Sequence, residues 1–427
     1  MDRTIRKPDF SSVLYSVTLA HIPPPNTRRL AVHVQATAER AVRQGHPWLF
    51  DQSIQQVSDG GEPGDLAVLY DRKRRFLAIG LYDPASPIRV RLLQANQPAT
   101  IDQVWLGQRL ATAIAHRASL LNTNTTGYRL VHGENDGLPG LVVDRYADTL
   151  VLKLYTVGWV RHLASLAAAL LAHFPAARLI LRLSRTVQAQ PAYLYGLRDG
   201  QLLHGTAGEC SVIFQENGLR FAADVCAGQK TGFFLDQRDN RARVAGLAEG
   251  REVLNMFAYT GGFSVYAARG GARRILSVDL NAQALAGAER NLGLNADVPA
   301  ISQTHHETWG ADAFTALAEL GAARRQFDLV ILDPPAFAQR QADVAGALAA
   351  YRRLAQLGTA LLPAGGVLVS ASCSSRVAAA DFWAAVHDGA RHSNKRLCEI
   401  IRTAHPLDHP ISFAEGAYLK CLFAYVA

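Results

Sequence analysis

The stretch Asn255-Met-Phe-Ala-Tyr-Thr-Gly-Gly-Phe263 begins within a short apolar segment at residues 252–257 and leads into an apolar pattern of helical spacing near residues 263–269. Further apolar segments at residues 274–278, 327–332 and 366–371 alternate with helix-period stretches near residues 282–291 and 346–362. Short buried strands that alternate with helices are typical of a parallel, doubly wound α/β sheet. Ligands of such sheets bind beyond the carboxyl ends of the strands, which is where the quoted stretch lies.

Paired glycines and two acids indicate which ligand this sheet binds. A dinucleotide site needs the spacing GxGxxG, but Gly261 and Gly262 are followed by Phe263 and no third glycine, which leaves no nest for a pyrophosphate. Asp279 ends the second strand, where a carboxylate accepts hydrogen bonds from ribose hydroxyls. Asp312, in Gly310-Ala-Asp-Ala-Phe314, lies between the segments at residues 274–278 and 327–332, where an acid that follows a third strand can meet an adenine amino group. A ligand with a ribose and no phosphate fits this pattern, and S-adenosylmethionine is the commonest.

Polar residues follow the fourth and fifth predicted strands. The fourth ends in Asp333-Pro-Pro-Ala-Phe337 and the fifth in Ser370-Ala-Ser-Cys-Ser-Ser375. In the strand order 3-2-1-4-5 the fourth and fifth strands are neighbours, so Asp333 and Cys373 should emerge side by side. The prolines stiffen the corner, its carboxylate and carbonyls face the edge of a base, and Phe337 can stack on that base.

Two reactions at this edge stay open. An exocyclic amine needs only acceptors at the Asp333 corner, whereas C5 of cytosine becomes nucleophilic only after a thiolate has added to C6. Cys373 has the residue type and position for that thiolate, although most cysteines outside active sites are small buried hydrophobes. A third alternative, from another class, is a non-catalytic RNA-binding or assembly factor.

The first half of the chain reads differently. Residues 28–98 carry short strands and glycine turns typical of a small β-barrel, and residues 99–215 an α+β middle domain without evident chemistry. A mobile tail is expected at residues 1–27 and the sheet domain at residues 216–427. Basic side chains and an aromatic in the barrel suit RNA, although a solvated hairpin explains them equally well; they are Trp48, Arg72, Lys73, Arg74, Arg75, Arg89 and Arg91.

Composition limits the class of protein. The 427 residues carry a formal net charge of +8, which suits a polyanionic partner such as nucleic acid. Five cysteines without a CxxC pair argue against a zinc ribbon or a disulfide framework and fit a reducing cytoplasm. No apolar run is long enough for a membrane span. The histidine spacing predicts no metal site.

Several blocks together resemble one family, the RlmI-type 23S ribosomal RNA cytosine-5 methyltransferases. The resemblance runs from about His46 to the C-terminus, and Asp-Pro-Pro and Ser-Cys-Ser are part of it. The other blocks are Gly45-His-Pro-Trp-Leu-Phe50, Tyr82-Asp-Pro-Ala-Ser-Pro87, Gly133-Glu-Asn-Asp-Gly-Leu-Pro-Gly140, Lys230-Thr-Gly-Phe-Phe-Leu-Asp-Gln-Arg238, Phe257-Ala-Tyr-Thr-Gly-Gly-Phe263, Asp408-His-Pro410 and Glu415-Gly-Ala-Tyr-Leu-Lys420.

The resemblance implies a fold, a reaction and a set of residues. The barrel is expected to be PUA-like and the C-terminal domain a Rossmann-like class I methyltransferase; the partner is expected to be 23S rRNA, with a homodimer as a candidate assembly. Cys373 would be the attacking thiolate and Asp333 the acid at the cytosine N3 side, with Pro334, Pro335 and Phe337 against the base. The second cysteine that many such enzymes carry is replaced here by Ala336, as in the RlmI type. Residues expected at the methyl donor are Lys230, Thr231, Gln237, Arg238, Asn255, Phe257, Tyr259, Thr260, Gly261, Asp279, Asp312 and Asp333.

Overall fold

A seven-stranded sheet forms the centre of the C-terminal part of the computed structural model, which describes residues 19–427. Its order is β16-β15-β14-β17-β18-β20-β19. The first five strands are parallel and follow the predicted order 3-2-1-4-5, while β20 runs antiparallel between β18 and β19. The strands are β14 (Glu252–Met256), β15 (Arg274–Asp279), β16 (His305–Gly310), β17 (Leu329–Leu332), β18 (Val367–Ser372), β19 (Leu397–Thr403) and β20 (Lys420–Val426).

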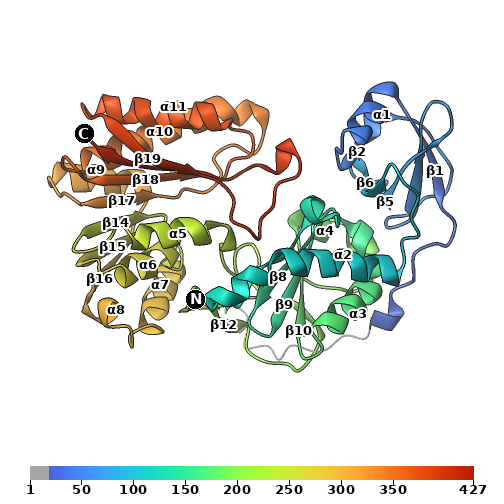
Figure 1. Cartoon of the computed structure of the whole chain (residues 1–427), viewed down its shortest axis with the longest axis horizontal. Coiled ribbons are helices and arrows are strands. Elements are labelled where there is room, and N and C mark those ends of the chain that lie inside the picture. The colour runs from blue at the N-terminus through green and yellow to red at the C-terminus, as the bar shows by residue number, and fades with distance from the viewer. Residues whose placement is uncertain (1–18) are drawn as a thin grey trace, which may run out of the picture. The chain divides into compact units, whose positions relative to one another are not determined.

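Helices cover both faces of this sheet (Figure 1). β17 and β18 are buried along their whole length, as parallel strands between two helical layers are. On one face Leu254, Val330 and Leu368 pack with Leu354 and Phe382 into a single apolar cluster. That face carries α9 (Ala313–Ala322), α10 (Val344–Ala360) and α11 (Ala379–His392), and the other carries α5 (Arg238–Ala245), α6 (Gly262–Arg269), α7 (Ala282–Gly293) and α8 (Pro299–Gln303).

The barrel segment forms a six-stranded sheet of order β2-β6-β5-β4-β1-β3 with its own apolar core, which includes Val32, Leu69 and Val90. Its alternating burial in β1 reflects the period-two apolar pattern of residues 30–34. The elements are β1 (Leu30–Val34), α1 (Ala36–Arg43), β2 (Trp48–Phe50), β3 (Ile54–Val57), β4 (Leu66–Tyr70), β5 (Phe76–Tyr82) and β6 (Ile88–Ala95).

The middle segment is a five-stranded sheet of order β11-β10-β9-β8-β7 with helices packed on it. Its strands are β7 (Gly127–His132), β8 (Leu141–Tyr146), β9 (Thr149–Leu154), β10 (Arg178–Leu183) and β11 (Gln201–His204). Its helices are α2 (Gln103–His116), α3 (Leu163–His173) and α4 (Arg185–Gln188). The Ala/Leu-rich α3 is a core helix, and no described helix is long and apolar enough to cross a membrane.

The chain divides into two compact units, and the boundary differs from the expected one at residue 216. The barrel and middle segments belong to the N-terminal unit together with residues 223–233. The C-terminal unit contains residues 123–125, 214–222 and 234–427, so the hairpin β12 (Ser211–Glu216) and β13 (Leu219–Asp224) is shared between the units. Residues 1–18 of the expected tail lie outside the described residues. The rest of it is packed, because Leu19 and Ile22 contact the middle core and Asn26 donates to Asp65 at 2.9 Å.

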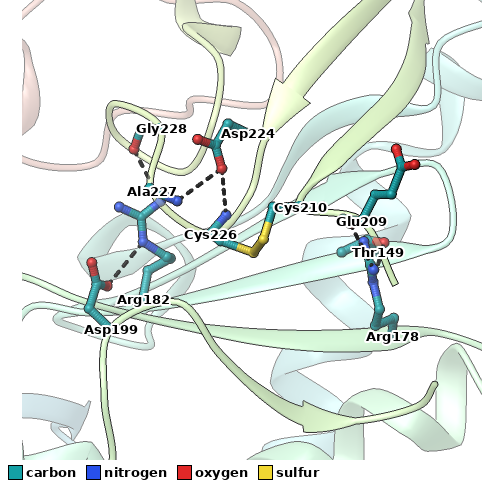
Figure 2. The surroundings of a disulfide bond; sticks show 10 residues. All are labelled: Thr149, Arg178, Arg182, Asp199, Glu209, Cys210, Asp224, Cys226, Ala227 and Gly228. Atoms are coloured by element: carbon teal, nitrogen blue, oxygen red, sulfur yellow. Dashed lines mark hydrogen bonds and ion pairs between the residues drawn. A yellow bond between two sulfur atoms is a disulfide. The ribbon is translucent and has the colours of Figure 1, made fainter. Parts of the chain in front are cut away.

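The cysteine spacing argued against a disulfide framework, yet one pair of cysteines is bonded. Cys210 and Cys226 are bonded, with their Cα atoms 5.4 Å apart, across the base of the β12–β13 hairpin (Figure 2). The carboxylate of Asp224 accepts the backbone N–H groups of Cys226 and Ala227 at 3.1 and 3.0 Å. Sequence spacing alone hid this pair, because the hairpin brings together residues that are 16 positions apart.

Candidate active site

The loop after β14 has a backbone that few side chains tolerate. Phe257, Tyr259 and Gly261 have φ angles of +58°, +47° and +72°, in the left-handed region. Gly261 is needed twice, because it adopts that conformation and because a Cβ there would lie 2.7 Å from the Cβ of Ala288 on α7. The loop therefore presents closely packed backbone at the carboxyl end of the sheet.

Asp279 ties this loop to the second strand. Its half-buried carboxylate accepts the backbone N–H of Tyr259 at 2.8 Å and that of Asn281 at 2.9 Å. The side chain of the next residue, Leu280, is 77% exposed. A carboxylate and an apolar surface thus adjoin at the end of β15. Leu280 was not among the residues expected at the donor, although its position directly after the acid is visible in the sequence.

Asn255 and Thr260, two residues expected at the donor, turn inward. The Asn255 amide donates to Ser264 at 2.8 Å, and Ser264 Oγ lies 2.7 Å from Ser277 Oγ, which contacts His306 at 2.8 Å. Burial lowers the pKa of His306. Asn255 therefore joins β14 to α6 and, through Ser264, to β15. The hydroxyl of Thr260 is buried and has no hydrogen-bond partner among residues 19–427.

Asp312 begins α9. Its exposed carboxylate accepts the backbone N–H of Thr315 at 3.0 Å and the Thr315 hydroxyl at 3.2 Å. An aspartate at this position satisfies an N–H group that the helix leaves unpaired. The capping bonds are made by Oδ1, so the structural role of Asp312 is the N-cap of α9.

A directed chain of hydrogen bonds ends at Asp333. Thr403 Oγ1 donates to Asn240 Oδ1 at 2.6 Å, Asn240 Nδ2 to Gln237 Oε1 at 2.6 Å, and Gln237 Nε2 to Asp333 Oδ1 at 2.8 Å. Each amide is oriented by the donor behind it, so Gln237 presents its N–H and not its oxygen to the acid. Gln237 was expected near the donor, and the structure links it to Asp333 on one side and, through Asn240, to Thr403 of β19 on the other.

Arg238 lies beneath the surface. Its side chain is 2% exposed and pairs with Asp408, which is fully buried, at 3.0 Å; His409 lies 3.2 Å from the same acid. Burial alone would lower the pKa of Arg238, but Asp408 holds it above its ordinary value. Burial would raise the pKa of Asp408, but His409 and Arg238 hold it well below. Arg238 thus joins the Lys230–Arg238 block to the Asp408-His-Pro410 block, instead of facing a ligand.

Cys373 and the Asp-Pro-Pro corner lie together, as the strand order predicted. β17 and β18 pair in parallel, with Leu332 opposite Ser370, and the Cys373 Sγ lies 3.9 Å from the Pro334 carbonyl oxygen. Pro335 is exposed and Pro334 buried. The half-buried ring of Phe337 lies 5.0 Å from that of Tyr351, so it packs partly on the core.

Lys230 and Thr231 belong to the N-terminal unit. Lys230 has φ +55°, and its carbonyl accepts from Nζ of Lys153. Burial lowers the pKa of Lys153 to about 8. Thr231 is 1% exposed; its hydroxyl donates to Asp144 and lies 3.0 Å from the Tyr146 hydroxyl. Its side chain therefore anchors the segment instead of facing solvent.

The expected RNA-binding residues separate into two groups. Residues 72–75 form an exposed basic turn around Asp71, whose carboxylate accepts the backbone N–H groups of Lys73 and Arg75 at 2.8 and 2.9 Å. Arg91, opposite Trp48 on neighbouring strands, is only 8% exposed, and burial lowers its pKa. Arg91, expected to bind RNA, is therefore too deeply buried to contact phosphates.

Trp48 and Arg89, also expected to bind RNA, are half-buried and make local contacts. Trp48 donates from Nε1 to Glu134 at 2.8 Å, and Arg89 donates to the carbonyl of Pro84. As for metal sites, residues 19–427 contain no cluster of three or more His, Cys, Asp or Glu side chains suited to an ion.

Comparisons with known proteins extend over nearly the whole chain. Residues 139–423 match the S-adenosylmethionine-dependent methyltransferase family model, and residues 32–95 match a PUA-like domain. A "Ribosomal RNA large subunit methyltransferase" of Deinococcus radiodurans is 49% identical over 94% of this chain and 98% of its own length. A "Ribosomal RNA large subunit methyltransferase I" of Shewanella denitrificans is 36% identical over 93% and 99%.

Solved structures agree in fold. A protein from Streptococcus mutans, described as a SAM-dependent methyltransferase, superposes with a TM-score of 0.77 at 20% identity, covering 93% of this chain and all of its own. A second methyltransferase structure, complexed with SAH, gives a TM-score of 0.78 at 21% identity and the same coverage. The family-model match, the relatives that cover almost the whole chain, the PUA-like domain and the strand order agree. This chain belongs to the S-adenosylmethionine-dependent methyltransferase family.

Proposed function

We propose that this enzyme methylates C5 of a cytosine in 23S ribosomal RNA, with Cys373 as the nucleophile. The observation that carries the proposal is the position of the Cys373 thiol, 3.9 Å from the Pro334 carbonyl at the end of the neighbouring strand. The names of the relatives from Deinococcus radiodurans and Shewanella denitrificans support ribosomal RNA as the substrate.

S-adenosylmethionine, the cofactor of the family, supplies an electrophilic methyl group when bound. The residues at the carboxyl end of β14 and β15 fit it in chemistry. The backbone of Phe257, Tyr259 and Gly261 allows close approach, the Asp279 carboxylate suits ribose hydroxyls, and the exposed Leu280 offers an apolar surface for a flat base. We assign the donor to these five residues, together with Asp312.

The residues around Cys373 account for the chemistry. The thiolate adds to C6 of cytosine, and the electron pair of the C5–C6 double bond moves toward C5, which can then attack an electrophile. Once C5 carries the methyl group, its hydrogen leaves as a proton to a base, and the Cys373 sulfur departs as the double bond re-forms. In this proposal Asp333, which accepts a hydrogen bond from Gln237, holds the N3 side of the base, and Pro335 and Phe337 are assigned to limiting the base's position.

We assign RNA binding outside the site to the exposed basic turn at residues 72–75. Four adjacent cationic side chains on a barrel rim suit contact with phosphates, which gives affinity and little sequence preference. The buried Arg91 and the half-buried Trp48 and Arg89 then support the barrel instead of contacting the phosphates directly.

The second candidate is methylation of an exocyclic amine, such as guanine N2. The hydrogen bond from Gln237 to Asp333 favours it, because it orients a carboxylate that can accept N–H groups at the base edge. This reaction needs no covalent step, so Cys373 would be dispensable.

RNA that contains 5-fluorocytosine distinguishes the two reactions. Release of Cys373 requires loss of a proton from C5, and a fluorine at C5 leaves no proton to remove, so the covalent adduct persists. With methyl donor, wild-type enzyme and Cys398→Ala should both form a denaturant-resistant protein–RNA complex, and Cys373→Ala should form none. Cys398 is the matched control, since it is also half-buried and outside the disulfide. Equal trapping by Cys373→Ala, or full methylation without Cys373, would refute the covalent mechanism.

A further inference from the structure

Lys420 lies beneath the loop that carries Cys373. It opens β20, where it pairs with Ser372 of β18 in the antiparallel register. Its side chain is 5% exposed, and Nζ donates to the carbonyl oxygens of Ser374 at 2.6 Å and Val377 at 2.8 Å. The Lys420 ammonium therefore forms hydrogen bonds to both ends of the turn that follows Cys373.

Tyr351 of α10 holds the same loop from another side. Ser372 Oγ donates to the Tyr351 hydroxyl at 2.9 Å, and that hydroxyl lies 2.9 Å from Ser374 Oγ. Ser372 and Ser374 are both fully buried, whereas Cys373 between them is half-buried. The residues on either side of the thiol are thus fixed by buried hydrogen bonds, and the thiol itself is left accessible.

The charge balance around the thiol includes one buried cation. Burial lowers the pKa of Lys420 to about 8, while the nearby Cys373 acts in the opposite direction. The other titratable groups at this edge supply no positive charge to the thiol. Burial raises the pKa of the Tyr351 hydroxyl, and burial, with the Asp333 charge as a smaller cause, raises the pKa of the Cys421 thiol. Lys420 is therefore the group among these that favours a negative charge on Cys373.

We propose that Lys420 is a positioning residue for Cys373: its ammonium fixes the turn that presents the thiol and favours the thiolate over the thiol. The inference rests on the proposed role of Cys373 as nucleophile. A cation near a cysteine increases the fraction that is ionised at neutral pH, and only the ionised form adds to a base. The neighbouring Arg376 is exposed on the same turn, so it is the matched cation that lacks these buried contacts.

The test measures thiol ionisation in the full-length enzyme without RNA. Iodoacetamide alkylation of Cys373 is followed against pH by peptide mass spectrometry, with Cys398 in the same sample as the internal reference. In Lys420→Met the midpoint pH for Cys373 should rise by about one unit, a roughly tenfold loss of thiolate below it. Lys420→Arg, which keeps the charge, and Arg376→Met should both stay close to wild type.

The proposal is overturned if Lys420→Met leaves the midpoint unchanged, or if Arg376→Met raises it equally. Should Lys420→Met not fold, Lys420→Gln keeps N–H groups for the carbonyls while removing the charge, and the same two outcomes decide. A shifted midpoint together with full methylation by Cys373→Ala would support the effect of Lys420 on the thiol and refute the proposed function alone.

Discussion

Replacing Arg238 with methionine tests whether this residue supports the fold or contacts the methyl donor. In wild type its guanidinium is 3.0 Å from Asp408, and the two side chains are 2% and 0% exposed. Methionine keeps much of the volume and removes the charge. Asp408 would then remain buried beside His409 without its arginine partner.

The magnitude follows from that burial. Removing one partner of a buried pair leaves an uncompensated charge, which costs about 3–5 kcal/mol, whereas replacing both partners is often neutral. We expect Arg238→Met to lower the free energy of unfolding of the C-terminal unit by that amount. The double variant Arg238→Met with Asp408→Asn should recover a large part of the loss, because no buried charge remains.

Urea unfolding is monitored by hydrogen exchange in peptides of α5 and β18. These peptides report the loss of unfolding free energy for the C-terminal unit alone. The control is Arg273→Met, which breaks a pair with Glu252 of the same 3.0 Å length, but one in which Arg273 is 63% exposed. That variant should cost at most about 1 kcal/mol. Calorimetry of donor binding is run under conditions where all variants are folded.

Two results would refute this reasoning. One is a cost for Arg238→Met no larger than that for Arg273→Met. The other is a double variant as unstable as the single one. If instead donor affinity fell in Arg238→Met while stability held, Arg238 would contact the donor, as the family resemblance first suggested.

Three further predictions concern other parts of the chain. Gly261→Ala should weaken donor binding in calorimetry and cost at least about 1–2 kcal/mol in urea, through its left-handed φ and the contact with Ala288; unchanged affinity would refute the loop assignment. Breaking the Cys210–Cys226 bridge by Cys210→Ser should cost about 3 kcal/mol, judged from the 16-residue separation, and make urea stability insensitive to reductant. Since the pKa of Asp408 is lowered in the folded state, its stabilisation is present above about pH 4 and lost as pH falls further; Asp408→Asn should flatten that part of the pH–stability curve.

The sequence was sufficient to locate four of the five parallel strands of the sheet, β14, β15, β17 and β18. Continuous apolar segments bounded by glycine, proline and polar residues predict buried strands, and β15 and β17 lie within a residue or two of the expected ranges. Handedness and crossover rules then place β17 beside β18, and with them Asp333 beside Cys373. The adjacency of the two catalytic candidates was therefore predictable without any structure.

Partners distant in sequence explain what was missed. Arg238 and Thr231 stand in a block typical of the family, yet their partners Asp408 and Asp144 are 170 and 87 positions away. A motif shows which residue type a position requires. That residue can either contact a ligand or form a hydrogen bond to a buried polar group elsewhere in the chain. Residue identity alone does not separate those two cases.

Lys420 is the sharpest instance of this ambiguity. A lysine at the start of an apolar strand is expected to face solvent, and on an edge strand its side chain would do so. β20 instead inserts antiparallel between β18 and β19, so its first residue lies under the neighbouring loop and its ammonium must find acceptors there. Strand alternation predicts the parallel order of the first five strands but says nothing about where a later strand returns. The environment of Cys373, and with it the ionisation of the thiol, is therefore determined by the part of the topology that local sequence pattern leaves undetermined.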